Sequence, residues 1–128
     1  MREILFRAKS NQTWYYGYIY PDYESPRRNI WRIATPNEDI LAINPDTICE
    51  WTGLTDKNGV KIFEGDIVKY KWCFLSNGSY HHYEDFIVEF KDSAYYIVPI
   101  KKHENIWTVY LNPESEYEVV GNIYDDNI

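Results

Sequence analysis

The sequence predicts an all-β protein, and three observations lead to this prediction. Short segments of alternating apolar and polar residues recur along the chain, and Gly, Pro, Asn and Asp separate them at intervals of about eight to twelve residues. No stretch keeps the apolar spacing of a helix for more than about one or two turns. Aromatic residues, which favour strands, make up 18% of the 128 residues.

The first half of the chain is expected to hold five short strands. They cover residues 3–8, 14–20, 30–34, 40–43 and 47–51. The second of them alternates most clearly, with Tyr16, Tyr18 and Tyr20 on one face and the residues between them on the other. Pro21 ends it, because proline has no N–H to donate to a neighbouring strand.

A turn, a bend and a strand follow one another in the middle of the chain. Residues 56–59, Asp-Lys-Asn-Gly, predict a turn, because Asp accepts a backbone hydrogen bond and Asn-Gly tolerates positive φ. Residues 64–66, Glu-Gly-Asp, predict a second bend. The next strand is expected to place Val68, Tyr70, Trp72 and Phe74 on a buried face and Lys69 and Lys71 on the opposite face.

The last part of the chain predicts a hairpin and a final strand. The hairpin strands cover residues 86–90 and 95–100, joined by a turn at 91–94, and the final strand covers 117–124. At this length the chain suits one domain or two very small subdomains. We expect an N-terminal β subdomain over residues 1–55 and a second subdomain over 56–128, with a soft boundary that also permits one compact unit.

Four sequence blocks resemble the YopX family of phage and prophage proteins. They are R-E-I-L-F-R-A-K at 2–9, T-G-L-T-D-K-N-G at 52–59, I-F-E-G-D-I-V at 62–68 and V-V-G-N-I-Y at 119–124. The resemblance implies a small β protein of unknown function with an SH3-like β-barrel over residues 56–128. Because the family has no established activity, the resemblance gives no catalytic residue.

Charge and cysteine content limit the location and the partners. The net charge of −7 disfavours a protein that wraps nucleic acid, since such binding depends on Lys and Arg. Cys49 and Cys73 form no C-x-x-C motif, so we expect neither a disulfide framework nor a zinc module, and a reducing cytoplasm fits best. No segment approaches the roughly 18 consecutive apolar residues of a membrane helix.

The sequence lacks a recognisable catalytic motif, and we expect a protein that is not an enzyme and needs no cofactor. There is no G-x-S-x-G elbow and no Gly-rich phosphate loop. His81 and His82 are adjacent, so in a strand they would point to opposite faces and not share one metal ion. We interpret residues 81–85 as a polar loop and expect no metal site. A metal-dependent hydrolase remains an alternative that would need three converging carboxylate or His side chains.

The candidate binding residues are aromatic side chains and nearby arginines. They are Tyr16, Tyr18, Tyr20, Arg27, Arg28 and Arg32. Alternate tyrosines on an exposed strand suit a protein interface, and with arginines they suit stacking of single-stranded bases. Alternatively, one tyrosine face packs on the core and the other lies under a neighbouring strand. We expect an interaction module that binds a protein partner or itself, with nucleic-acid binding as the alternative.

A second candidate surface is the acidic end of the chain. Residues 104–128 contain six Asp and Glu residues and no Lys or Arg. Such a segment can simply form the charged outer face of strands, or it can meet a basic partner.

Overall fold

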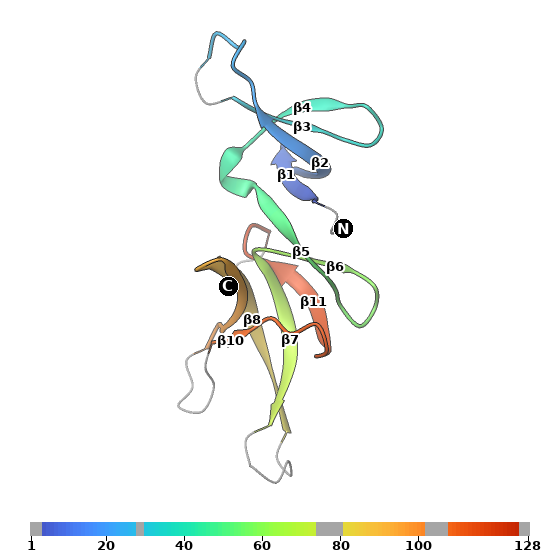
Figure 1. Cartoon of the computed structure of the whole chain (residues 1–128), viewed down its shortest axis with the longest axis vertical. Helices are drawn as coiled ribbons and strands as arrows, with labels where there is room; N and C mark the ends of the chain where they lie inside the picture. The colour runs from blue at the N-terminus through green and yellow to red at the C-terminus, as the bar shows by residue number, and fades with distance from the viewer. Residues whose placement is uncertain (1–3, 28–29, 74–80, 102–107, 126–128) are drawn as a thin grey trace. The chain divides into compact units, whose positions relative to one another are not determined.

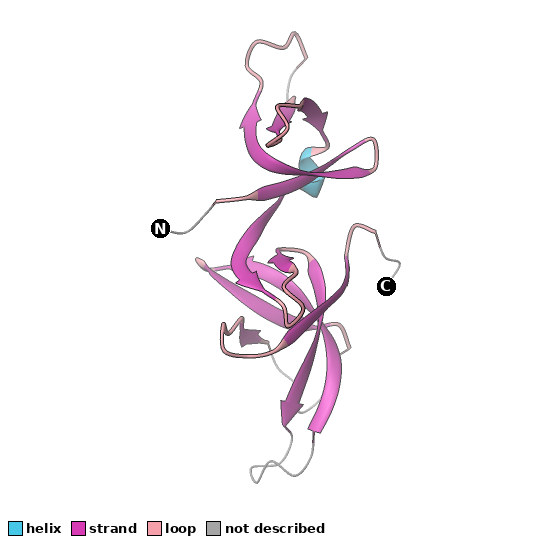
Figure 2. Cartoon of the chain, turned by 90° about the vertical axis from the view of Figure 1, so that its right-hand side faces the viewer, coloured by secondary structure: helices cyan, strands magenta, loops and turns pink. Residues whose placement is uncertain are grey.

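The computed structural model describes residues 4–27, 30–73, 81–101 and 108–125. Within these ranges the regular elements are strands, apart from one turn of 3₁₀ helix, η1 (Pro45–Thr47) (Figure 2). The prediction of an all-β protein is confirmed. The chain divides into two compact units, Met1–Gly53 and Leu54–Ile128, and each is described by itself.

The first unit is an antiparallel sheet. Its strands are β1 (Phe6–Ser10), β2 (Thr13–Pro21), β3 (Trp31–Ala34), β4 (Ile40–Ile43) and the start of β5 (Cys49–Thr55) (Figure 1). They lie in the order β4-β3-β2-β1-β5. Strand β5 continues past the boundary at Gly53, and β6 (Lys61–Phe63) follows it in the sheet order.

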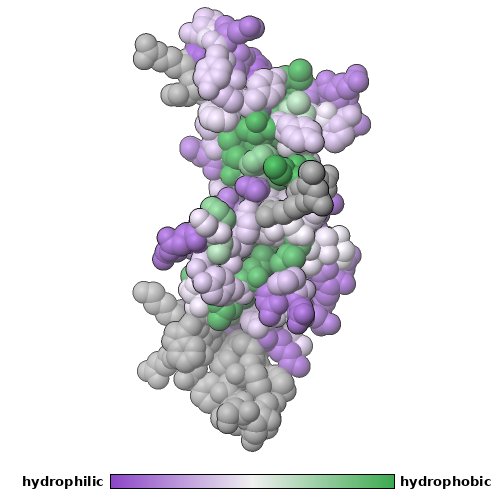
Figure 3. Space-filling view, in the orientation of Figure 1, coloured by the Kyte–Doolittle hydropathy of each residue, from purple (hydrophilic) through white to green (hydrophobic). Residues whose placement is uncertain are grey.

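One face of the first sheet carries the core of this unit. Ala8, Ile33 and Ile43 are buried there. Partly buried neighbours complete the cluster, namely Tyr15, Ile19, Trp31, Leu41 and Ile48. Figure 3 shows that each unit has its own area of apolar residues.

Strands β2 and β3 approach each other closely at Gly17. A Cβ atom at this position would lie 2.0 Å from the backbone oxygen of Ala34. Gly17 is buried, so no outward movement into solvent relieves that contact. The position therefore requires glycine.

The second unit contains a five-stranded antiparallel sheet. Its strands are β7 (Asp66–Cys73), β8 (His81–Lys91), β9 (Ala94–Pro99), β10 (Val109–Tyr110) and β11 (Tyr117–Asn122), in the order β10-β9-β8-β7-β11. Its buried cluster consists of Ile62, Val68, Phe86, Val88, Ile97 and Tyr117. Val68 is in this core and Tyr70 packs against it, as the alternation predicts, while Lys69 and Lys71 are exposed. The side chain of Trp72 and the whole of Phe74 lie outside the described part.

The predicted turn at residues 56–59 is confirmed, and Asp56 holds it together. One carboxylate oxygen of Asp56 accepts hydrogen bonds from the N–H groups of Asn58 at 2.8 Å and Val60 at 2.9 Å. The other oxygen accepts from the N–H of Val119 in β11 at 2.9 Å. The turn thereby satisfies backbone groups at the outer edge of β11, which is the last strand of this sheet among the described residues.

The bend at residues 64–66 joins three strands. Gly65 has a φ of 86°, a conformation that favours glycine. Its N–H donates to the oxygen of Val88 in β8, and its oxygen accepts from the N–H of Ile123 just after β11. The carboxylate of Asp66 accepts from the N–H of Phe63 at 2.8 Å. Backbone geometry thus accounts for the Gly and the Asp of this bend.

The structure does not confirm the expected barrel, and it contradicts the expected loop at residues 81–85. In the pairings of the described residues neither sheet closes on itself, so the SH3-like barrel is not confirmed. The polar loop expected at residues 81–85 is wrong, because these residues begin β8 and pair with β7. Half of a strand's side chains face away from the core, so polar composition does not exclude a strand. Where the structure describes the chain, it holds no helix long and apolar enough to cross a bilayer.

Candidate functional site: an aromatic and cationic face

The three predicted tyrosines of β2 form one exposed row, here called the tyrosine face. Their exposed fractions are 44% for Tyr16, 68% for Tyr18 and 38% for Tyr20. The alternate residues Tyr15 and Ile19 pack against the core on the other side. The sheet thus turns one aromatic set inward and presents the other to solvent.

Two cations of β1 lie at one end of the tyrosine face, Lys9 partly exposed and Arg7 buried. Arg7 pairs with Tyr16 and Lys9 with Trp14, and directly opposed residues of antiparallel strands share a face. The guanidinium carbon of Arg7 lies 4.6 Å from the ring centroid of Trp14, and Nζ of Lys9 lies 5.3 Å from it. Both distances are in the range of a cation–π interaction, which orders the rim of this face.

Arg32 lies at the other end of the tyrosine face. It is opposite Tyr20 in the pairing of β2 and β3, so the two side chains share the outward side. Its Nε donates a hydrogen bond of 3.0 Å to a carboxylate oxygen of Asp22. This bond is the main reason why the pKa of Asp22 lies below its ordinary value. Arg32 is therefore held in place rather than free in solvent.

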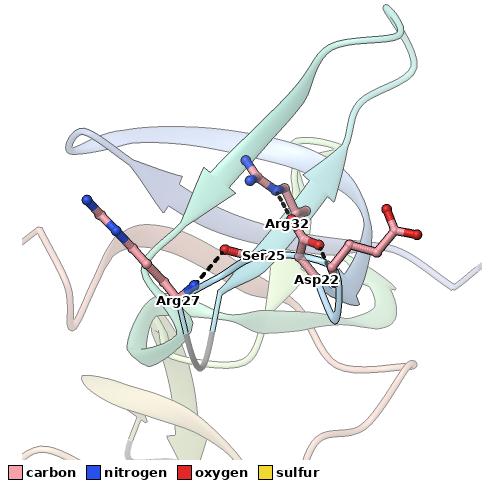
Figure 4. A network of polar contacts seen from close by, with 5 residues as sticks. Asp22, Ser25, Arg27 and Arg32 are labelled. Atoms are coloured by element: carbon pink, nitrogen blue, oxygen red, sulfur yellow. Dashed lines mark hydrogen bonds and ion pairs between the residues drawn. The ribbon is translucent and has the colours of Figure 1, made fainter.

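The segment after β2 is built from short local hydrogen bonds. Asp22 accepts from the N–H of Glu24 at 3.1 Å, and the hydroxyl of Ser25 accepts from the N–H of Arg27 at 3.2 Å. The Arg27 side chain points away from the other labelled residues in Figure 4. Arg28, the remaining predicted residue, lies outside the described part of the chain.

A cleft of about 400 Å³ lies beside this segment. Its lining residues are Pro21, Asp22, Tyr23, Ser25, Arg27, Ile30 and Trp31. Two aromatic rings and a proline provide apolar walls, and Arg27 provides a positive charge. Arg27 and Arg32 thus lie at the same end of β2. Asp22 is hydrogen-bonded to Arg32 and lines the same cleft as Arg27.

The ion pair makes a direct prediction about Asp22. Replacing Arg32 by Gln should raise the pKa of the Asp22 carboxyl toward its ordinary value, because the hydrogen bond and the positive charge both favour the ionised form. An NMR titration of the side-chain carboxyl carbons measures this. Arg27→Gln is the matched control and should leave the Asp22 pKa unchanged, because no Arg27 contribution lowers it. An equal rise in both variants would contradict the assignment.

Arg7, Lys9 and Trp14 also lie at this face, although they are not among the predicted binding residues. The sequence signal for them was the turn between β1 and β2, where Asn11 and Gln12 both have positive φ, 50° and 66°. Asn commonly begins two-residue hairpin turns of this kind. Once the turn is placed there, the pairing of Lys9 with Trp14 follows by counting along both strands.

The described residues contain no group of three or more His, Cys, Asp and Glu side chains placed to hold a metal ion. The side chains of His81 and His82 are outside that description, so the prediction about them stays a prediction.

The fold and this face define a β protein of two small units, one of which presents tyrosines and cations from a single sheet. The chain belongs to the YopX family: the family model described as YopX protein matches residues 5–127, nearly its whole length. The resemblance seen in the four sequence blocks is confirmed, and the match also spans the region between the third and fourth blocks. No curated protein matches the chain.

Proposed function

We propose that this member of the YopX family is a non-enzymatic interaction module and that the tyrosine face binds a protein partner, which includes a second copy of the chain. The observation that carries the proposal is the exposed row of Tyr16, Tyr18 and Tyr20 on a strand whose other side is core. Exposed aromatic side chains that lie next to one another are uncommon on proteins that stay monomeric, and they often mark an interaction surface.

The composition of the face fits a protein interface. Tyr, Trp and Arg are the residues enriched in such interfaces and in their energetic centres. Tyrosine has few rotatable bonds, so ordering it on binding costs little conformational entropy. Lys9 and Arg32 at the two ends favour a partner surface with acidic residues around an apolar centre.

A second candidate, single-stranded nucleic acid, is favoured by one observation. Cations lie at both ends of the row of rings, and one of them, Arg32, is paired with Asp22. Alternate residues of a strand are about 6.5 Å apart, so unstacked bases would lie on successive tyrosine rings. The net charge of −7 weighs against this candidate.

Affinity purification of the tagged chain from phage-infected or lysogenic cells, with and without nuclease, tests the proposal. The wild type should retain a partner in a nuclease-insensitive way, and a Tyr16→Ser/Tyr18→Ser variant should lose most of it. Tyr110→Ser is the matched control, since Tyr110 is 65% exposed and lies in the second unit.

Each outcome of this comparison has a meaning. Nuclease-sensitive recovery would favour the second candidate. Equal recovery with the wild type, the double variant and the Tyr110→Ser control would reject the tyrosine face as the binding surface. Size-exclusion chromatography with light scattering separates self-association from a foreign partner.

A phage or prophage origin and a cytoplasmic location belong to the same proposal. The family relationship supports the first, and the two cysteines without a C-x-x-C motif support the second.

A further inference from the structure

Lysines gather at one cleft of the second unit, although this unit is acidic. Residues 54–128 contain thirteen Asp and Glu residues and seven Lys. Lys57, Lys69 and Lys71 nevertheless line the same cleft, whose volume is about 290 Å³. Three of the seven lysines of this unit therefore meet at one cleft.

The backbone fixes where these three side chains begin. Lys69 and Lys71 are two residues apart in β7, so both project from the same side of the sheet. Lys57 reaches the cleft because its N–H donates a 2.9 Å hydrogen bond to the oxygen of Tyr117 in β11. The neighbouring Asp56 bond to Val119 holds the same turn against β11. The meeting of the lysines is thus built into the turn and the sheet.

Carboxylates lie beside two of the three lysines of the cleft. Glu118 lies 3.8 Å from Nζ of Lys57 and is also opposite Lys69 in the pairing of β7 and β11. Glu116 is the second carboxylate in the lining. Lys71 is instead opposite Tyr83, with Nζ 6.0 Å from the ring centroid. Asp85 is opposite Lys69 in the pairing of β7 and β8, so three carboxylates lie near the three cations, and Lys71 is the lysine that faces a ring.

We propose that this cleft binds a phosphate monoester. A phosphoryl group carries a charge of about −1.5 to −2 and three strong acceptor oxygens, so one group can contact several ammonium groups at once. A single carboxylate would only take over the role of Glu118. The exposed ring of Tyr83 in the lining offers a surface for the group that carries the phosphate.

The size of the cleft limits the ligand. Its volume of about 290 Å³ is at the lower end of the range for small-molecule sites, which is about 300 to 1,000 Å³. A nucleoside monophosphate or one phosphorylated side chain of a partner protein carries the required group. The cleft belongs to the second unit and the tyrosine face to the first. Phosphate binding at the cleft therefore does not depend on the function proposed for the tyrosine face.

NMR titration of the full chain at constant ionic strength tests the inference. The probes are inorganic phosphate, a nucleoside monophosphate and a short phosphoserine peptide. Saturable shifts at Lys57, Lys69 and Lys71 are expected with millimolar phosphate. Tighter binding of the nucleotide would identify a small molecule as the source of the phosphate, and tighter binding of the peptide would identify a phosphorylated partner.

Charge-removing variants make the test specific. Lys71→Gln should weaken binding by roughly threefold, and Lys69→Gln/Lys71→Gln by roughly tenfold, because each exposed ion pair contributes modestly. Lys91→Gln is the matched control, an exposed β8 lysine outside this cleft, and should change nothing. Absence of saturable shifts in the wild type, or equal weakening by Lys91→Gln, would overturn the inference.

Discussion

Replacing Gly17 by Ala should lower the free energy of unfolding of the first unit by about 3 kcal/mol, the upper end of the usual cost of overpacking. The added Cβ would lie 2.0 Å from the oxygen and 2.8 Å from the carbonyl carbon of Ala34. Both are backbone atoms, so no side-chain rotation relieves the overlap. Strands β2 and β3 would have to separate, which weakens their pairing and the packing of Ile19 and Ile33.

A urea titration read at individual amide signals measures this effect. Ile33 reports on the first core and Val88 on the second. Gly59→Ala is the control: nothing lies within 4 Å of its added Cβ, but its φ is 83°. That variant should cost only about 1 kcal/mol at Val88, the usual cost of a left-handed conformation for Ala. A Gly17→Ala effect no larger than this would show that the strands are not closely packed there.

The Gly17→Ala variant should also disturb the tyrosine face, because the spacing of its rings depends on strand pairing. Tyr16 and Tyr18 flank Gly17, and their outward direction follows from the pairing of β2 with β1 and β3. If the strands separate, the row of rings should lose its spacing. Loss of partner binding by Gly17→Ala would then reflect the sheet, which is why the test of function uses tyrosine substitutions.

Local rules explain what the sequence predicted well. The alternation of β2, the turn at residues 56–59 and the inward Val68 and Tyr70 each depend on residues close together in the chain. Such features follow from the two-residue period of strands and from the preference of Asn, Asp and Gly for turns.

Long-range pairing explains what the sequence could not predict. Which tyrosine set of β2 is exposed depends on Ala8, Ile33 and Ile43, which come from three other strands. The meeting of Lys57 with Lys69 depends on a bond to Tyr117 and on the register of β11, which shifts between Val119 and Gly121. An alternating pattern gives each strand two faces but does not say which neighbour covers one of them.

Asp56→Asn should lower the free energy of unfolding of the second unit by about 3 kcal/mol at neutral pH, in the range for losing hydrogen bonds to a charged group. Asp56 is 7% exposed and accepts three backbone hydrogen bonds. An amide keeps one acceptor oxygen, but its NH₂ group must then face a backbone N–H. Either the turn at Asn58 and Val60 or the bond to Val119 is therefore lost.

The pH dependence of this effect identifies the carboxylate as its source. Burial would raise the pKa of Asp56, but hydrogen bonds from Val119, Val60 and Asn58 outweigh it and hold the pKa below its ordinary value. A carboxyl group with a lowered pKa in the folded state stabilises the fold above its unfolded pKa of about 3.9. That contribution disappears as the pH falls through the folded pKa. The gap between wild type and Asp56→Asn should therefore be largest near pH 7 and shrink steadily below about pH 4.

Asp39→Asn is the matched control for the same substitution at an exposed turn position, and it should change stability by less than about 0.5 kcal/mol at either pH. Urea titrations read at Val88 for Asp56→Asn and at Ile33 for Asp39→Asn give the two differences. An Asp56→Asn gap that stays constant from neutral to acid pH would mean that the shape of the side chain, and not its charge, holds the turn against β11. A gap that closes in acid would instead assign the role of Asp56 to its charge and to the three backbone N–H groups that it accepts from.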